Sequence, residues 1–157
     1  MTVENLDQQC YELRPVGRIT RSGKEIRVQI GEPFRPAMQL LGCFTHLIVV
    51  WWADKHDNDK SRAALQCEPS FAPGQMHGVF ATRAESRPNP IAITTCKMLC
   101  IDEQAGFIQI ANIDALDGTP VVDLKPYYPA CDRVQTARIP EWLSDWPDCM
   151  PEEGLGL

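Results

Sequence analysis

The chain has 157 residues, 44% of them apolar, and this length supplies the core of one domain but hardly of two. A net charge of −6 argues against a uniformly basic nucleic-acid-binding protein. No apolar run approaches the length of a membrane span, and the acidic N-terminus is unlike a secretory signal. We therefore expect a cytoplasmic protein that does not enter a membrane.

The seven cysteines form no C-x-x-C pair, and no histidine pair has zinc-finger spacing. Their count is odd and the expected compartment is reducing. The sequence therefore favours scattered, buried thiols over metal or redox chemistry, and it predicts no metal site.

The N-terminal third predicts a leader followed by two strands. Residues 1–12 are expected to form a flexible leader, and strands are expected at 12–19 and 24–30, with a turn at Ser22-Gly23. In the second strand, isoleucine and valine alternate with charged and polar residues, which is the two-residue period of a half-buried strand.

The middle of the chain predicts one strong strand and one long loop. Residues 36–42 favour a single short helical turn, and the near-continuous apolar run at 45–53 favours a strand buried on both faces. The polar stretch 54–75 predicts a long loop, and such loops in small domains are usually functional or mobile.

Four more short strands and one short helix are expected in the rest of the chain. The strands are predicted at 77–82, 91–101, 106–114 and 120–125, and the helix at 140–146. Many short strands without a long amphipathic helix indicate an all-β barrel or sandwich. The absence of βαβ alternation and of a G-x-G-x-x-G turn argues against a Rossmann-type fold.

The first chemically interesting segment is 78–93, which reads GVFATRAESRPNPIAI. The two prolines restrict Arg87 and Asn89 to extended geometry, so the turn is rigid. With Arg83, these residues could bind a carboxylate or phosphate, because arginine offers a planar fork of donors. The alternative is a proline-stiffened β-turn whose arginines pair with acidic side chains.

The second segment is 112–127, which reads NIDALDGTPVVDLKPY. Its Asp-Gly dipeptide predicts a turn. The three aspartates and the loop carbonyls suit a ribose, an amino group or a sulfonium, although they also suit a turn capped by aspartate side chains. The side chains that could bind are Asp114, Asp117, Asp123, Lys125 and Tyr127.

Together, in this order, the two segments resemble the TsaA-like family of β-barrel S-adenosylmethionine-dependent methyltransferases. The pattern G-x-F-A-T-R-x-x-x-R-P-N-P-I-G matches at all but its last position, where Ala92 replaces glycine. The pattern D-x-x-D-G-T-P-V-x-D-I-K-P-Y matches from Asp114 to Tyr127, with Leu124 as a mild change. Weaker similarity at 15–19 and 42–48 extends the resemblance to about residues 13–130.

The resemblance implies a small, mainly antiparallel β-barrel, closed or partly open, with short helical turns. The barrel would occupy 13–138 and dimerise, and 139–157 would be a tail with a short helix. S-adenosylmethionine would bind near the dimer interface, contacted by Arg83, Ile93, Asp114, Asp117, Gly118 and Thr119. Four further residues would shape the loop or contact the substrate: Arg87, Asn89, Lys125 and Tyr127. The catalytic base stays unassigned between Asp114 and His77.

The activity implied by the resemblance is methylation of N6 of threonylcarbamoyladenosine in tRNA, or of a related acceptor. A basic stretch at 13–35, with six basic and two acidic residues, could present a basic face to RNA, or it could equally be a solvated surface on which basic residues cluster by chance. The family's Pro-Arg-Gln segment is shortened here to 20–24, and its F-H-Q-like strand end reads Ala53-Asp54-Lys55. The alternatives are a module that binds or senses an adenosyl ligand without turnover, and a dimeric structural domain with an anion-binding turn.

Overall fold

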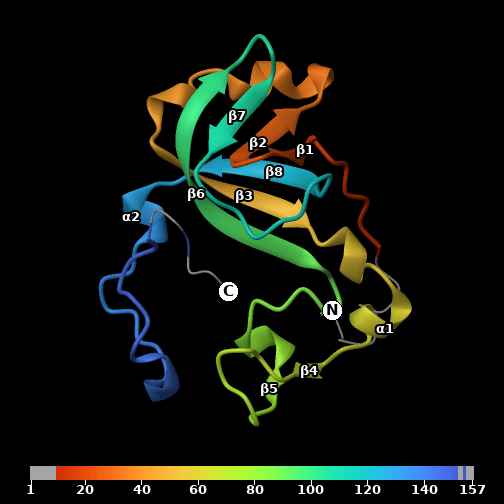
Figure 1. The fold of residues 1–157 in the computed structure, drawn as a ribbon, viewed down its shortest axis with the longest axis vertical. Coiled ribbons are helices and arrows are strands. Elements are labelled where there is room, and N and C mark those ends of the chain that lie inside the picture. The colour runs from red at the N-terminus through yellow and green to blue at the C-terminus, as the bar shows by residue number, and fades with distance from the viewer. Residues whose placement is uncertain (1–9, 152–153, 155–157) are drawn as a thin grey trace, which may run out of the picture.

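Six antiparallel strands close into a barrel in the computed structural model, which describes residues 10–151 and 154 (Figure 1). Neighbouring strands follow the order β1-β2-β7-β6-β3-β8. Their bounds are β1 Gly17–Ser22, β2 Glu25–Ile30, β3 His46–Trp52, β6 Ile91–Asp102, β7 Phe107–Ile110 and β8 Pro120–Pro126. The predicted fold class, a mainly antiparallel β-barrel with short helical turns, is confirmed, and the barrel is closed.

The barrel interior is filled by the inward-facing side chains of every strand, as expected for a small closed barrel. The alternation predicted for β2 is confirmed, because every second side chain is buried. The prediction that β3 is buried on both faces is confirmed fully for one face only. Leu47, Val49 and Trp51 are buried, whereas the alternate side chains on the outer face of the barrel are only partly buried.

The first hairpin brings two backbones into close contact. Strand β1 begins at Gly17, later than the predicted start at residue 12, and its register with β2 and β8 starts at that residue. A Cβ atom on Gly17 would lie 2.3 Å from the carbonyl oxygen of Gln29, so a larger residue would push the strands apart. The turn itself is made by Gly23, whose φ of 58° suits glycine.

Two 3₁₀ helices connect β2 to β3, where a single turn at 36–42 was predicted. They are η2 Glu32–Met38 and η3 Leu41–Cys43. The buried side chain of Met38 joins the barrel core, and it therefore fixes η2 against the barrel.

Residues 54–90, here called the connecting lobe, link β3 to β6 and lie below the barrel in Figure 1. The predicted strand at 77–82 is wrong. Only His77–Gly78 (β5) is extended, and it pairs with Gln66–Cys67 (β4), which is equally short. With no barrel strand beside it, the chain then turns into the 3₁₀ helix η5, Val79–Ala81. The other lobe elements are η4 Asp54–His56 and α1 Asp59–Arg62.

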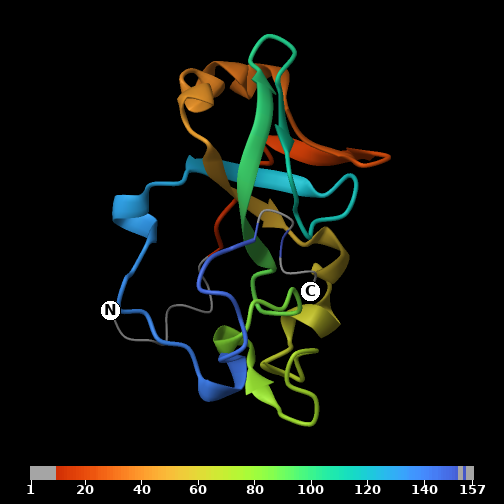
Figure 2. The same ribbon diagram turned by 60° about the vertical axis from the view of Figure 1, so that its left-hand side comes forward.

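The C-terminal segment (residues 134–151) leaves the barrel after α2, Pro129–Asp132, and extends to the connecting lobe (Figure 2). Its only helix among the described residues is the 3₁₀ helix η6, Glu141–Leu143, shorter than the predicted helix at 140–146. Most of the predicted leader and the end of the predicted tail, at 1–9, 152–153 and 155–157, lie outside the described residues. Within the described part, no helix has both the length and the apolar character that crossing a membrane requires.

Candidate functional site

A cleft of about 1110 Å³ follows β6 from Ile91 to Lys97. Residues of the barrel strand form one wall, residues of the connecting lobe another, and the C-terminal segment adds Leu143, Trp146 and Met150. This volume is at or slightly above the usual range for small-molecule sites, which is roughly 300–1,000 Å³. The cleft therefore has room for a nucleoside-sized ligand.

The turn that contains Arg-Pro-Asn-Pro forms part of the lobe side of the cleft, and the Arg87 side chain holds the chain before it in place. The Arg87 guanidinium donates to the backbone carbonyls of Val79, Thr82 and Ala84, each at 3.3 Å. Arg87 thus holds together the chain that leads into the turn. Its partners are carbonyl groups rather than the acidic side chains that a simple ion-paired turn would use.

Arg83 and Asn89 stand on the same wall and are both exposed. The carbonyl of Asn89 accepts a hydrogen bond from the backbone N–H of Ile91 at 2.7 Å, which joins the turn directly to β6. Because Arg83 is exposed and lines the cleft, its guanidinium can reach a ligand there. Ile93, which is 48% exposed, supplies an apolar surface in the same cleft.

Asp114 places a carboxyl group on the cleft wall near these residues. Partial burial raises the pKa of Asp114, the nearby charge of Glu85 raises it further, and Arg21 opposes both effects. Glu85 also lines the cleft. The two carboxylates favour a cationic ligand group beside them.

Arg21, which sequence reasoning did not assign to the site, supports the loop that carries Asp114. Its side chain donates from Nε to the carbonyl of Ala115 at 3.0 Å and from Nη2 to that of Ile113 at 2.5 Å. Its backbone N–H donates to Oδ1 of Asp117 at 2.8 Å. The only sequence signal was an arginine in the hairpin where the family's Pro-Arg-Gln segment is shortened.

The residues of the second motif lie in different places: Asp114 is on the cleft wall, whereas the residues after it are not. Asp117, Gly118 and Thr119 are absent from the cleft wall and instead fasten the loop to β1. Gly118 donates to the carbonyl of Ile19 at 2.8 Å, and Ile19 donates back to the carbonyl of Thr119 at 2.9 Å. Gly118 has the positive φ, 81°, expected at the predicted turn.

Lys125 and Tyr127 lie at the far end of β8 and do not line the cleft. Lys125 pairs with Asp123 at 2.8 Å, and the backbone N–H of Tyr127 donates to the carbonyl of His46. Of the ten predicted site residues, the cleft gathers five: Arg83, Arg87, Asn89, Ile93 and Asp114.

His77 is buried in a row of aromatic rings rather than on the cleft wall. It packs edge-on against Phe71 at 6.3 Å and Trp142 at 5.8 Å, measured between ring centroids. Phe71 also contacts Trp146, at 5.4 Å, and both of these rings line the cleft. The sequence did not predict that Phe71 and Trp146 line the cleft. The signals that could have indicated it are the long loop at 54–75 and the two tryptophans near the C-terminus.

Comparison with known proteins gives one consistent result. A protein of Archaeoglobus fulgidus named "Probable S-adenosyl-L-methionine-binding protein" is 37% identical over 118 residues, which are 75% of this chain and 30% of that protein. A protein of the same description from Pyrococcus abyssi is 32% identical over 149 residues, or 85% of this chain and 76% of the relative. The crystal structure of TrmO matches with a TM-score of 0.64 and 28% identity, over 83% of this chain and 64% of the TrmO chain.

This chain therefore spans about two thirds of the solved TrmO chain and under a third of the A. fulgidus relative. The sequence profile that it matches covers residues 14–133, which is most of its length and includes both motifs. The resemblance noted in the sequence is confirmed: the chain belongs to the family of the tRNA-methyltransferase O N-terminal domain.

Proposed function

We propose that this protein binds S-adenosylmethionine in the cleft beside β6 and transfers its methyl group to an acceptor. The observation that carries the proposal is the meeting of Arg83, Asp114 and Ile93 on one cleft. A guanidinium fits a carboxylate, a carboxylate fits an ammonium or sulfonium, and an isoleucine side chain fits the face of a purine. Family membership and the names of the relatives support the same ligand.

S-adenosylmethionine would supply an electrophilic methyl group, and the contribution of the chain would be alignment and electrostatics. Arg83 would orient the ligand from the lobe side, while Asp114 and Glu85 would stabilise positive charge. The acceptor must lose a proton. Asp114 is the better candidate for the base, because it faces the cleft and its raised pKa brings it closer to the working pH.

The acceptor class that we propose is tRNA, which the family name mentions. That the methylated nucleoside is threonylcarbamoyladenosine is implied only by the resemblance described above. Only some of the basic side chains at 13–35 are available to bind tRNA, because others are engaged in contacts within the protein. Arg27 stacks on Phe107 with its guanidinium 4.2 Å from the ring centroid, and Arg21 supports its loop. Arg18 and Lys24 are exposed on the first hairpin, and we assign phosphate contacts to them.

We also propose that the protein acts as a homodimer in the cytoplasm. Exposed apolar side chains gather along the cleft, with Phe80 at 83%, Ile93 at 48% and Ile91 at 40% exposure. A second copy would shield them from water. Light scattering should give twice the chain mass, and a monomeric mass at all concentrations would remove this part of the proposal.

The direct test of ligand binding is calorimetry with S-adenosylmethionine, together with thermal unfolding. A ligand that binds only the native state at about 100 times its Kd stabilises it by about 2.7 kcal/mol, so Tm must rise. No heat and no Tm shift at millimolar ligand would eliminate both the enzyme and the binding module. Arg83→Ala should weaken binding with little change in the ligand-free Tm, because Arg83 is exposed.

A second candidate function is an adenosyl-ligand sensor that performs no methyl transfer. This candidate is favoured because the family's Pro-Arg-Gln segment is shortened here to 20–24. The arginine of this segment, Arg21, is engaged in hydrogen bonds to the 113–117 loop. Incubation with tRNA and radiolabelled S-adenosylmethionine separates the two functions. Label in tRNA supports the enzyme, whereas ligand binding without label supports the sensor.

A further inference from the structure

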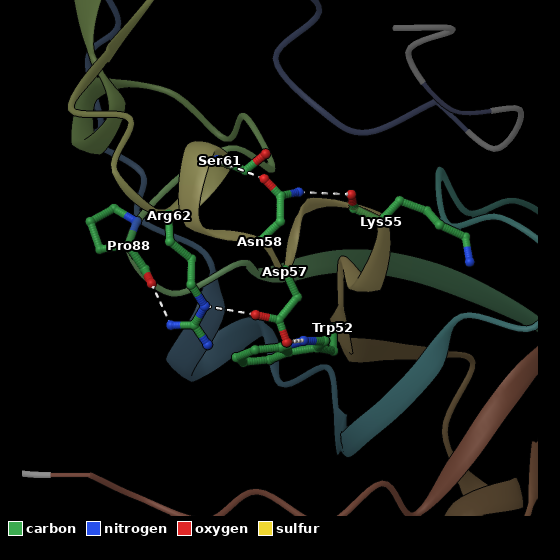
Figure 3. Close-up of polar contacts among 7 residues, drawn as sticks. All are labelled: Trp52, Lys55, Asp57, Asn58, Ser61, Arg62 and Pro88. Atoms are coloured by element: carbon green, nitrogen blue, oxygen red, sulfur yellow. Dashed lines mark hydrogen bonds and ion pairs between the residues drawn. The ribbon is translucent and has the colours of Figure 1, made fainter.

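A cluster of polar contacts joins the end of β3 to the Arg-Pro-Asn-Pro turn (Figure 3). Arg62 donates from Nε to Oδ1 of Asp57 at 2.7 Å and from Nη1 to the carbonyl of Pro88 at 2.9 Å. The indole N–H of Trp52 donates to Oδ2 of Asp57 at 3.0 Å. The Arg62 guanidinium also lies over the Trp52 ring, 5.6 Å from its centroid. Arg62 therefore bridges the barrel and the turn.

Local structure presents Arg62 in this position. It is the last residue of α1, whose first turn is capped by Asn58, with the side-chain oxygen accepting from the backbone N–H of Ser61 at 3.0 Å. Asp57 immediately precedes the cap. Hydrogen bonds from Arg62 and, to a lesser extent, Trp52 hold the pKa of Asp57 below its ordinary value, so the carboxylate form is favoured.

Residues between 53 and 62 contact every second residue of the turn, at Ser86, Pro88 and Pro90. His56 Nδ1 lies 2.9 Å from Oγ of Ser86, Arg62 binds the carbonyl of Pro88, and the backbone N–H of Ala53 donates to the carbonyl of Pro90 at 2.9 Å. The turn between them carries Arg87 and Asn89, which line the cleft. Of these contacts, only the one made by Arg62 pairs a charged side chain with the carbonyl at the centre of the turn.

We propose that Arg62 is a positioning residue of the cleft: by holding the carbonyl of Pro88, it fixes the Arg-Pro-Asn-Pro turn in the conformation that receives the ligand. The inference rests on the proposed function, since it concerns binding of S-adenosylmethionine. Arg62 does not line the cleft, so it acts through the turn and not by touching the ligand.

The chemistry requires arginine at this position. One planar guanidinium serves the carboxylate, the carbonyl and the indole face together, whereas a lysine ammonium is a point donor on a flexible chain. Lysine would keep the ion pair with Asp57 and lose either the Pro88 contact or the stacking. Charge alone therefore should not restore the positioning.

The test compares Arg62→Ala and Arg62→Lys with the wild type by calorimetry with S-adenosylmethionine, well below Tm. Both variants should bind roughly tenfold or more weakly, the loss expected for a hydrogen bond to a charged group. Guanidinium ion at low millimolar concentration, below the denaturing range, should restore part of the affinity of Arg62→Ala and none of that of Arg62→Lys. Arg14→Ala is the matched control, because Arg14 pairs with Glu12 on an exposed surface.

The outcomes separate this inference from the proposed function. If the wild type does not bind, the proposed function fails. If the wild type binds and Arg62→Ala binds equally well, or Arg62→Lys regains full affinity, the positioning role is wrong. Should Arg62→Ala fold poorly, Asp57→Asn takes its place. That variant keeps the shape of Asp57 but removes the charge that orients Arg62, so unchanged affinity in it would equally overturn the inference.

Discussion

Asp114 is the residue at which charge and ligand binding should be coupled most directly. Its pKa is raised by partial burial and by Glu85, so it gains its proton at a higher pH than an ordinary aspartate with a pKa of 3.8. The neutral form no longer attracts an ammonium or sulfonium group. We therefore predict that the affinity for S-adenosylmethionine is full above the raised pKa and falls as the pH drops through it.

Calorimetric Kd values between pH 4 and pH 8 check this prediction. Asp114→Asn should bind more weakly at neutral pH and show a flatter pH profile, because the titrating group has been removed. Glu103→Gln is the control, since Glu103 is exposed on the β6–β7 turn outside the cleft wall. An Asp114→Asn profile as steep as that of the wild type would assign the pH dependence to another group.

Arg21 shows why residue-level roles were only partly predictable. The pattern of the second motif covers 114–127, but it does not indicate which of those residues face a cavity. That depends on Arg21 and Ile19, about a hundred positions earlier, whose hydrogen bonds draw 117–119 onto β1 and leave Asp114 on the cleft wall. Contacts this distant in sequence leave no local period or spacing to recognise.

At the scale of elements, the C-terminal segment closes one side of the cleft through a few aromatic contacts. Trp146 packs on Phe71 and lines the cleft, whereas Trp142 packs on His77 and remains 53% exposed. We predict that Trp146→Ala releases the segment locally, because such ring pairs contribute about 0.5–1.5 kcal/mol beyond the area that they bury. Hydrogen exchange in 134–151 should accelerate while exchange in β3 and β6 does not.

Trp142→Ala provides the comparison for that measurement. Its loss should expose His77 and affect the aromatic row, but it leaves the cleft wall at Trp146 in place. If Trp146→Ala instead accelerated exchange throughout the barrel, the segment would be part of the cooperative core and not a separately opening wall.

Strands that pair within the barrel were predicted well, whereas the strand expected in the connecting lobe was not. The alternation of Ile26, Val28 and Ile30 identified β2 because one face of that strand meets the core. The stretch 77–82 also looks strand-like, but it pairs only with a two-residue strand and therefore turns. Strand formation there depends on the presence of a partner, which local sequence does not specify.

At the scale of the whole molecule, the closed barrel should unfold as one cooperative unit, since each strand pairs on both sides and all share one core. Leu47 is fully buried, so Leu47→Ala should lower the free energy of unfolding by about 2–5 kcal/mol. Leu99→Ala is the matched control. Leu99 is 53% exposed on β6, and its loss should change stability by less than about 0.5 kcal/mol.

Denaturant unfolding followed by near- and far-ultraviolet circular dichroism measures this difference. Trp51 is buried in the barrel and its indole N–H donates to Thr94 at 3.1 Å, so near-ultraviolet signals report partly on the core. The two probes should give coincident transitions for the barrel in both variants. A separate early transition that Leu47→Ala leaves unchanged would belong to the connecting lobe or the C-terminal segment. The cleft walls would then open without the barrel unfolding, which is how a site enclosed on several sides can admit a large acceptor.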